Sequence, residues 1–352
     1  MRLRHPPARA AAAAACLFGA AVGAAQPLSY HVTPLGPPGA TQPLVGGINA
    51  VGHVAGAAIL PGKLGEHALL LSTARFIDLG TLGGRTSFAT AVSDGNAVVG
   101  TSTTASNAEH AFLWQAGTMS DLGTLPGGDL SQAEGINKSR QVVGFASVGG
   151  AYHAFRYAAG AMVDLGTLPG ATASAARDIN DDGVVVGDSG STAVTHAFVY
   201  KDGRMSDLGT LGGPTSSSAA LAVNAAGQVA GAAWDPAEGG ATTAVLWTQG
   251  LATDLGLPAG AGATSSYARG INDRGLVVGT FTRPQAPVPQ GAFISDGTRI
   301  ANLEDLLDAT SAGWSVYSAA GIDRANQISA IVWDGQAYRL AVLVPVDPAA
   351  GR

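Results

Sequence analysis

Histidine and aspartate recur in this sequence in pairs that could support acid–base chemistry or bind a metal. Each histidine precedes an aspartate by 11 residues, and the pairs are His67 and Asp78, His110 and Asp121, His153 and Asp164, and His196 and Asp207. A group that is repeated in every copy of a motif is more typical of structure than of catalysis. We therefore expect a His–carboxylate hydrogen bond that ties two neighbouring strands together. Successive histidines lie 43 residues apart, on different copies, so they cannot converge on one ion and we predict no metal site.

A second set of polar residues shares one position of the repeat, two residues before a turn that begins with Ile or Val. Glu134, Arg177 and Arg269 take this position, on what we predict to be the inner strand of each copy. Together they would form a polar pocket at the mouth of a ring. The same groups could also act on a polymer, with Glu134 as the base and Arg177 or Arg269 stabilising negative charge.

The connections between copies carry side chains that are suited to binding. They include Arg85, Tyr267 and Trp314. Aromatic and Arg side chains on loops held by a rigid scaffold are common anchors of binding surfaces. We therefore expect a ligand-binding face formed by Glu134, Arg177 and these three residues together with Arg269. The alternative is that the three connection residues are ordinary solvated side chains.

Two further motifs indicate chemistry only weakly. Asn180-Asp-Asp-Gly183 lacks the alternating carboxylates and the closing Glu of a calcium loop. Gly187-Asp-Ser-Gly190 is similar to the surroundings of a serine protease nucleophile, but no histidine outside the repeat is placed to act as its base. We assign no catalytic residue and predict no cofactor.

The composition indicates a globular protein made of buried strands and tight turns. Of 352 residues, 46% are hydrophobic, 12% are charged and 50 are Gly. This composition argues against disorder, which requires low hydrophobicity with high charge. The net charge of −6 argues against nucleic acid as a partner, since phosphate recognition depends on clustered Lys and Arg.

The N-terminal residues differ from the rest of the chain. Residues 1–25 combine three arginines, an Ala-rich apolar run and small residues at Ala24 and Ala25, which is typical of a signal peptide cleaved after one of these two. A membrane anchor is the alternative, although the run is shorter than the roughly 20 residues of a spanning helix. Lipidation of Cys16 is a further alternative. We expect export to the periplasm or the medium, a single domain at 26–347 and a short tail at 348–352.

A strict period of 43 residues identifies a repeat array. One period contains four short apolar runs, at 174–180, 184–187, 196–200 and 205–211, which are separated by turn residues. This pattern predicts a four-stranded antiparallel sheet. The turn, the His-Ala-Phe position and the Asp-Leu-Gly position each occur seven times when degenerate copies are counted.

The ends of the array predict that it closes into a ring. The chain enters the repeat in its Asp-Leu-Gly strand, at 30–36, and leaves it in its His-Ala-Phe strand, at 338–345, so two incomplete copies complement each other. We predict an all-β, seven-bladed β-propeller that is closed by pairing of its N-terminal and C-terminal strands. The alternatives are a propeller with another number of blades and an open β-solenoid.

The sequence His110-Ala-Phe-Leu-Trp followed by Asp121-Leu-Gly-Thr-Leu-Pro-Gly-Gly resembles the bacterial extracellular HAF-repeat family. The match is close in four copies between residues 67 and 213. The resemblance implies export and a repeat architecture, and it carries no activity.

These observations favour an exported, monomeric propeller without enzymatic activity, which binds a peptide, a glycan or an envelope protein through its variable loops. The alternative is a lyase or hydrolase that acts on an extracellular polymer at the mouth of the central channel. No second apolar run is long enough to span a membrane.

Overall fold

The computed structural model describes residues 28–191, 193–213, 215–236 and 239–346. The predicted signal peptide, with Cys16, and the predicted tail at 348–352 lie outside these residues. Within the described ranges, no helix is long and apolar enough to cross a membrane.

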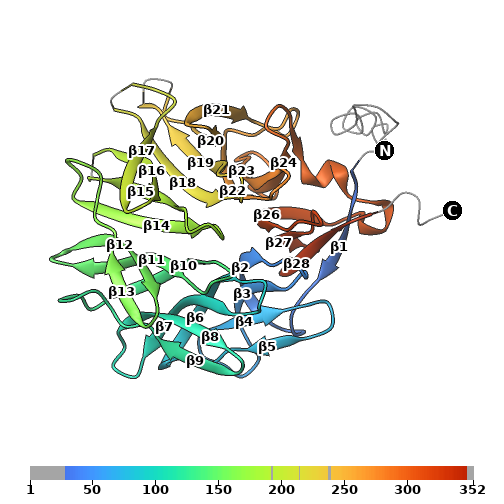
Figure 1. Ribbon diagram of the computed structural model, residues 1–352. Helices are drawn as coiled ribbons and strands as arrows, with labels where there is room; N and C mark the ends of the chain where they lie inside the picture. The colour runs from blue at the N-terminus through green and yellow to red at the C-terminus, as the bar shows by residue number, and fades with distance from the viewer. Residues whose placement is uncertain (1–27, 192, 214, 237–238, 347–352) are drawn as a thin grey trace, which may run out of the picture.

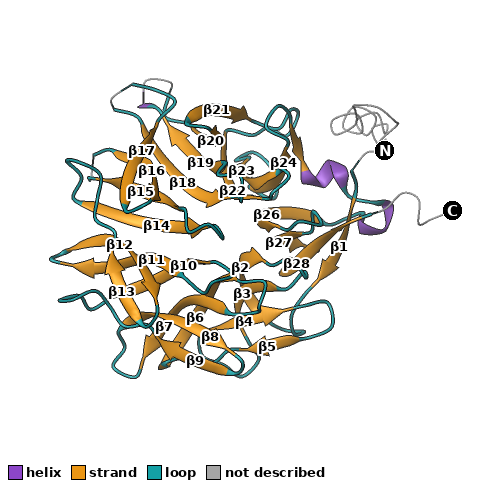
Figure 2. Cartoon of the chain, viewed as in Figure 1, coloured by secondary structure: helices purple, strands orange, loops and turns teal. Residues whose placement is uncertain are grey.

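The chain forms seven four-stranded antiparallel sheets arranged around a central axis (Figure 1; Figure 2). Blade one contains β2 (Thr41–Ile48), β3 (Val54–Ile59), β4 (Glu66–Leu71) and β5 (Phe76–Asp78). Blade two contains β6 (Gly83–Val92), β7 (Val98–Thr104), β8 (Glu109–Gln115) and β9 (Thr118–Asp121). Blade three contains β10 (Ser131–Ile136), β11 (Val142–Val148), β12 (Ala151–Ala158) and β13 (Ala161–Asp164).

The later blades repeat this order, with the innermost strand first. Blade four contains β14 (Ala173–Ile179), β15 (Val185–Gly190), β16 (Thr195–Lys201) and β17 (Arg204–Gly209). Blade five contains β18 (Ser217–Val223), β19 (Val229–Trp234), β20 (Thr242–Thr248) and β21 (Leu251–Gly256). Blade six contains β22 (Ser265–Ile271), β23 (Val277–Thr282), β24 (Gln290–Ser295) and β25 (Ile300–Asn302), and the 3₁₀ helices η2 (Leu303–Leu306) and η3 (Ala309–Ser311) follow it.

Blade seven closes the ring. It contains β26 (Ser315–Ile322), β27 (Ile328–Trp333) and β28 (Tyr338–Pro345), and its outermost strand is β1 (Tyr30–Pro34) from the other end of the chain. β1 pairs with β28 in an antiparallel register from Tyr30 opposite Pro345 to Pro34 opposite Ala341, and the two strands lie side by side in Figure 1. The free edge of β1 is partly covered, because the Val32 N–H donates to Ser311 Oγ at 2.9 Å. The predicted seven-bladed, closed propeller is confirmed.

The hydrophobic core lies between neighbouring blades. Phe112, Phe155 and Phe198 of the His-Ala-Phe motif are fully buried, and the cluster around Phe155 combines side chains of blades two and three. Gly144, which ends the Val-Val-Gly run, packs so closely on the inner strand that an added Cβ would overlap the carbonyl oxygen of Gln132. This close approach explains why the run ends in Gly.

A buried serine joins each of five blades to the blade before it. Ser131 of β10 accepts a hydrogen bond from the Ala111 N–H at 2.8 Å and donates one to the Gly123 carbonyl at 2.5 Å. Both partners belong to the repeat motifs of blade two, the Ala of His-Ala-Phe and the Gly of Asp-Leu-Gly. The serines that make the same pair of hydrogen bonds in the other blades are Ser87, Ser174, Ser218 and Ser266.

Candidate binding site at the loop mouth of the ring

The inner strands carry β-bulges, at which one residue has no partner on the neighbouring strand. In six blades the pairing between the first two strands skips a single residue at the same position, and these residues are Thr90, Glu134, Arg177, Leu221, Arg269 and Ala320. They stand at the position that the sequence singled out, two residues before the turn. A bulged residue has no partner in the ladder and its side chain is re-aimed. Because no strand lies between an inner strand and the axis, the bulges face the central channel.

Glu134 and Arg177 meet across the boundary between blades three and four. Arg177 Nη1 lies 3.6 Å from Glu134 Oε1, and Arg177 Nε donates to Asp188 Oδ1 at 2.7 Å. The guanidinium also lies 5.7 Å from the centre of the Phe145 ring, within the range of a cation–π contact. Arg177 is thus held by two carboxylates and an aromatic ring.

The charges of this cluster are strongly coupled. Burial raises the pKa of Glu134, while Arg177 opposes the rise and Asp188 adds to it. Burial acts to lower the pKa of Arg177, but Asp188 and Glu134 outweigh it and raise this pKa above its ordinary value. The guanidinium therefore stays charged, with its charge neutralised by its own chain.

Arg269 lies in a different setting, in a cavity of about 410 Å³ that we call the seam cavity. Blades six, seven and one form its wall, with Arg269, Thr280 and Gln290 from blade six, residues 317–320, Ile331 and Tyr338 from blade seven, and residues 42–45 from blade one. Gln42, Gln290 and Tyr338 lie at or near the starts of β2, β24 and β28, and Thr280 and Ile331 lie in the second halves of the antiparallel strands β23 and β27. The cavity therefore extends toward the end of the channel that we call the loop mouth, where the variable connections gather.

The Arg269 guanidinium has no hydrogen bond or ion pair with any residue that the structure describes. Its side chain is exposed, so water reaches it between the walls of the channel. These walls lower its pKa through desolvation, whereas Tyr267 acts to raise it. An arginine nevertheless remains protonated at any physiological pH, so the seam cavity contains an uncompensated positive charge.

The other predicted binding residues lie around the loop mouth but not in the seam cavity. The Tyr267 hydroxyl donates to Thr242 Oγ1 at 3.2 Å, toward blade five. Arg85 is exposed on β6, and Trp314 is half-buried against the hydrophobic core of the closing blade. The structure therefore brings Glu134 and Arg177 together and leaves Arg269, Arg85, Tyr267 and Trp314 apart from them among the described contacts.

The repeated His–Asp pairs lie on the outer strands of their blades, far from one another along the ring. His Nδ1 and an Asp oxygen lie 2.8 Å apart in the pairs of His67, His110 and His153, and 2.7 Å apart in the pair of His196. Each contact joins the third strand of a blade to the fourth. In blade five a hydroxyl takes the place of the imidazole, because Thr243 Oγ1 donates to Asp254 Oδ1 at 2.5 Å. Since a side chain without acid–base function can replace the histidine, we infer that the pairs are structural.

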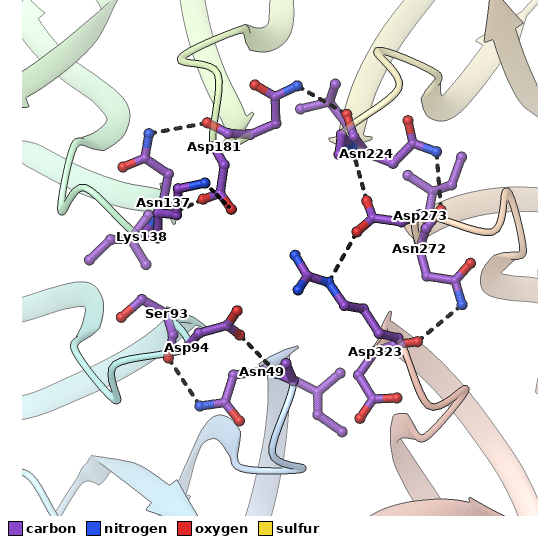
Figure 3. Close-up of a pocket in the computed structure, with 18 of the residues that line it drawn as sticks. Asn49, Ser93, Asp94, Asn137, Lys138, Asp181, Asn224, Asn272, Asp273 and Asp323 are labelled. Carbon is purple, nitrogen blue, oxygen red and sulfur yellow. Dashed lines mark hydrogen bonds and ion pairs between the residues drawn. The ribbon is translucent and has the colours of Figure 1, made fainter.

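The opposite end of the channel, the turn mouth, is lined by the turns that follow the inner strands (Figure 3). Its cavity of about 220 Å³ receives three residues from each blade, at 48–50, 92–94, 136–138, 179–181, 223–225, 271–273 and 322–324. In five blades an Asn Nδ2 donates to the backbone carbonyl of the equivalent residue in the next blade, at 3.0 or 3.1 Å. These residues are Asn49, Asn137, Asn180, Asn224 and Asn272.

Asp323 interrupts this chain of amides at the closing blade. Its Oδ1 accepts the N–H groups of Ala325 and Gln327 at 2.8 and 2.7 Å, as the Asn Oδ1 does in other blades. Its Oδ2 therefore occupies the position that the Asn Nδ2 has in other blades. By the symmetry of the repeat, this position faces the backbone carbonyl of Asn49 in blade one. This oxygen is buried and has no partner within the described chain. Burial raises the pKa of Asp323, against the two N–H donors.

We predict that Asp323→Asn stabilises the protein by about 1 kcal/mol at neutral pH, because Nδ2 can donate where Oδ2 has no donor. The pKa of Asp323 is higher in the folded than in the unfolded chain, so its contribution to stability is complete at low pH and is lost as pH rises through the folded pKa. The advantage of the variant should therefore grow as pH rises above about 4, the ordinary pKa of an aspartate. Urea unfolding of both proteins measures it, and a difference independent of pH would contradict the assignment.

The sequence did not identify the residues that surround Arg269 in the seam cavity. Leu44 and Tyr338 belong to the first complete blade and to the last strand, and they meet only because the ring closes. The predicted pairing of the two chain ends was the signal that could have found them, since it makes blades seven and one neighbours.

Comparisons with known proteins support the fold and do not identify a function. No protein-family model and no curated protein sequence matches this chain. Among solved structures, an oligogalacturonate lyase from Vibrio parahaemolyticus is similar with a TM-score of 0.56 at 8% identity, over 92% of this chain and 98% of the lyase. A prolyl endopeptidase gives 0.54 at 12% identity, and TolB from Acinetobacter baumannii gives 0.43 at 12% identity, each over 91% of this chain.

The chain spans 51% of the peptidase and 63% of TolB. At these identities the likeness to the lyase and the peptidase shows a common propeller fold. The HAF-repeat resemblance stays a prediction.

Proposed function

We propose that this protein is an exported propeller that binds a ligand at the loop mouth and carries out no reaction of its own. The observation that carries the proposal is the seam cavity, in which Arg269 has no partner among the described residues. Export is inferred from residues 1–25, and sequencing of the mature N-terminus tests it. A start other than Ala25 or Gln26 would contradict the cleavage that we propose.

The contrast between the two ends of the channel supports this choice. At the turn mouth Asp273 pairs with Arg324 at 3.1 Å and Asp181 pairs with Lys138 at 3.3 Å (Figure 3), and the unpartnered Asp323 Oδ2 there is buried. At the loop mouth the exposed hydrophobic side chains of Leu44 and Tyr338 adjoin the free guanidinium of Arg269. Exposed apolar groups around a polar anchor are typical of a binding site.

The lyase or hydrolase alternative requires Glu134 to act as a base. Burial raises the pKa of Glu134, which would suit a base, but the carboxylate is paired with Arg177 and Arg269 lines a separate cavity. The contacts therefore favour binding. Cleavage of a bound polymer that is abolished by Glu134→Gln would establish the enzyme instead.

The proposal predicts that screening on arrays of glycans, peptides and envelope fragments yields a ligand whose affinity falls at least about tenfold in Arg269→Ala. A charge-assisted hydrogen bond contributes about 1.5–3 kcal/mol, and 1.4 kcal/mol corresponds to a factor of ten. Arg85→Ala is the matched control, because Arg85 is exposed near the same mouth and lies outside the seam cavity. Equal losses in both variants, or no loss in either, would exclude the seam cavity as the binding site.

A further inference from the structure

We propose that the seam cavity binds a sugar that carries a carboxylate, a uronic acid residue, with the carboxylate on Arg269 and the sugar ring against Tyr317 and Tyr338. This inference depends on the proposed binding function and specifies the chemistry of its ligand.

The charge of the cavity suits an anionic ligand group. Its thirteen lining residues include one charged side chain, Arg269, and no Asp or Glu. Arg177, which occupies the equivalent bulge two blades away, is held by Asp188 and Glu134. Arg269 thus lacks the neutralising partners that the same chain supplies at the equivalent position. A carboxylate matches the planar fork of a guanidinium and can accept two parallel hydrogen bonds.

The aromatic wall of the cavity suits a ring with C–H groups on its faces. The rings of Tyr317 and Tyr338 lie edge to face, with centroids 4.8 Å apart and planes at 64°. The ring of Trp333, the cross-strand partner of Tyr338, lies beside it at a centroid distance of 4.8 Å. Tyr338 keeps 36% of its surface exposed, so this ring is open to a ligand. A pyranose presents C–H groups on its faces and packs well on such a surface.

The remaining polar groups suit hydroxyls. Gln42 and Gln290 carry amides that both donate and accept, and Ser318 carries a hydroxyl. None of these three side chains has a hydrogen-bond partner among the described residues. A ligand with several hydroxyls around one carboxylate would use them together, and about 410 Å³ lies within the usual range of small-ligand sites, about 300–1,000 Å³.

A peptide with a free C-terminus could also present a carboxylate, but the site favours the sugar. Extended peptides commonly bind by adding a strand to a free sheet edge. On the inner strands β22 and β26, bulges interrupt the ladder beside the cavity, so the backbone there offers no regular row of hydrogen-bonding groups.

The test measures binding of a short oligogalacturonate and of its carboxyl-reduced, neutral counterpart by titration calorimetry. We expect saturable binding of the acidic sugar, a loss of at least about tenfold for the neutral one, and a similar loss for Arg269→Ala. Tyr338→Ala should also weaken binding, and Tyr152→Ala, which changes an exposed Tyr on blade three, should leave it unchanged.

Three results would overturn the inference. Equal affinity for the acidic and neutral sugars would show that the carboxylate is not recognised. Binding of carboxyl-terminal peptides through Arg269, without binding of the sugar, would assign the site to peptides and leave the proposed binding function intact. Failure of wild-type protein to bind the acidic sugar, the neutral sugar or carboxyl-terminal peptides would count against the proposed function itself.

Discussion

Replacing Tyr30 by alanine should lower the free energy of unfolding by about 3–5 kcal/mol, as truncation of a fully buried aromatic side chain usually does. Tyr30 begins β1, is 0% exposed and belongs to the hydrophobic cluster of the closing blade. Its ring packs among side chains from the end of the chain, so the substitution acts on the contact that closes the ring. Urea unfolding followed by circular dichroism measures the effect.

Tyr30→Phe separates the packing of the ring from its hydroxyl group. The Tyr30 hydroxyl is buried without a partner in the described structure, and burial raises the pKa of Tyr30. Removing an unsatisfied buried hydroxyl should leave stability unchanged or raise it, by about 1 kcal/mol at most. The exposed Tyr152, on the outer part of blade three, provides the control for alanine substitution. If Tyr30→Ala cost no more than Tyr152→Ala, β1 would contribute little to the closed ring.

The tertiary fold could be predicted from the sequence because the turn residues, the apolar runs and the incomplete copies at the two ends all indicate the same architecture. Each period carries its own turns and apolar runs, and the incomplete copies at 30–36 and 338–345 determine how the ring closes. Even the bulge position could be found by counting two residues back from each turn, because the bulge recurs at a fixed place in the motif. The regularity of the scaffold is therefore what made it predictable.

The candidate site was less predictable because it depends on differences between blades. Arg177 and Arg269 occupy equivalent positions, yet only Arg177 has an aspartate, Asp188, on the next strand. In blade six the equivalent position on β23 is Thr280. The residue that distinguishes the two arginines lies on the second strand of the same repeat, but the register between the first two strands was needed to show that Asp188 and Thr280 stand at equivalent places. The walls of the seam cavity come from three blades and both chain ends, so three-dimensional contacts were needed to define it.

Replacing Ser131 by alanine should destabilise the protein by roughly 2–3 kcal/mol, although the change removes one oxygen atom. That oxygen accepts from the Ala111 N–H at 2.8 Å and donates to the Gly123 carbonyl at 2.5 Å. Ser131 is 0% exposed, so both backbone groups would lose their partner away from solvent. Because the serine belongs to β10 and both partners belong to blade two, the loss falls on the junction between blades.

The same reasoning explains why serine recurs at this position of the repeat. A hydroxyl both donates and accepts, whereas alanine or valine would leave an N–H and a carbonyl unpaired at every junction. Ser120→Ala is the matched control, since Ser120 is exposed on β9 of the preceding blade and should change stability by less than about 0.5 kcal/mol. Urea unfolding of the two variants compares them directly. A cost for Ser131→Ala as small as that of the control would mean that water replaces the hydroxyl, and the serines would then not be what holds successive blades together.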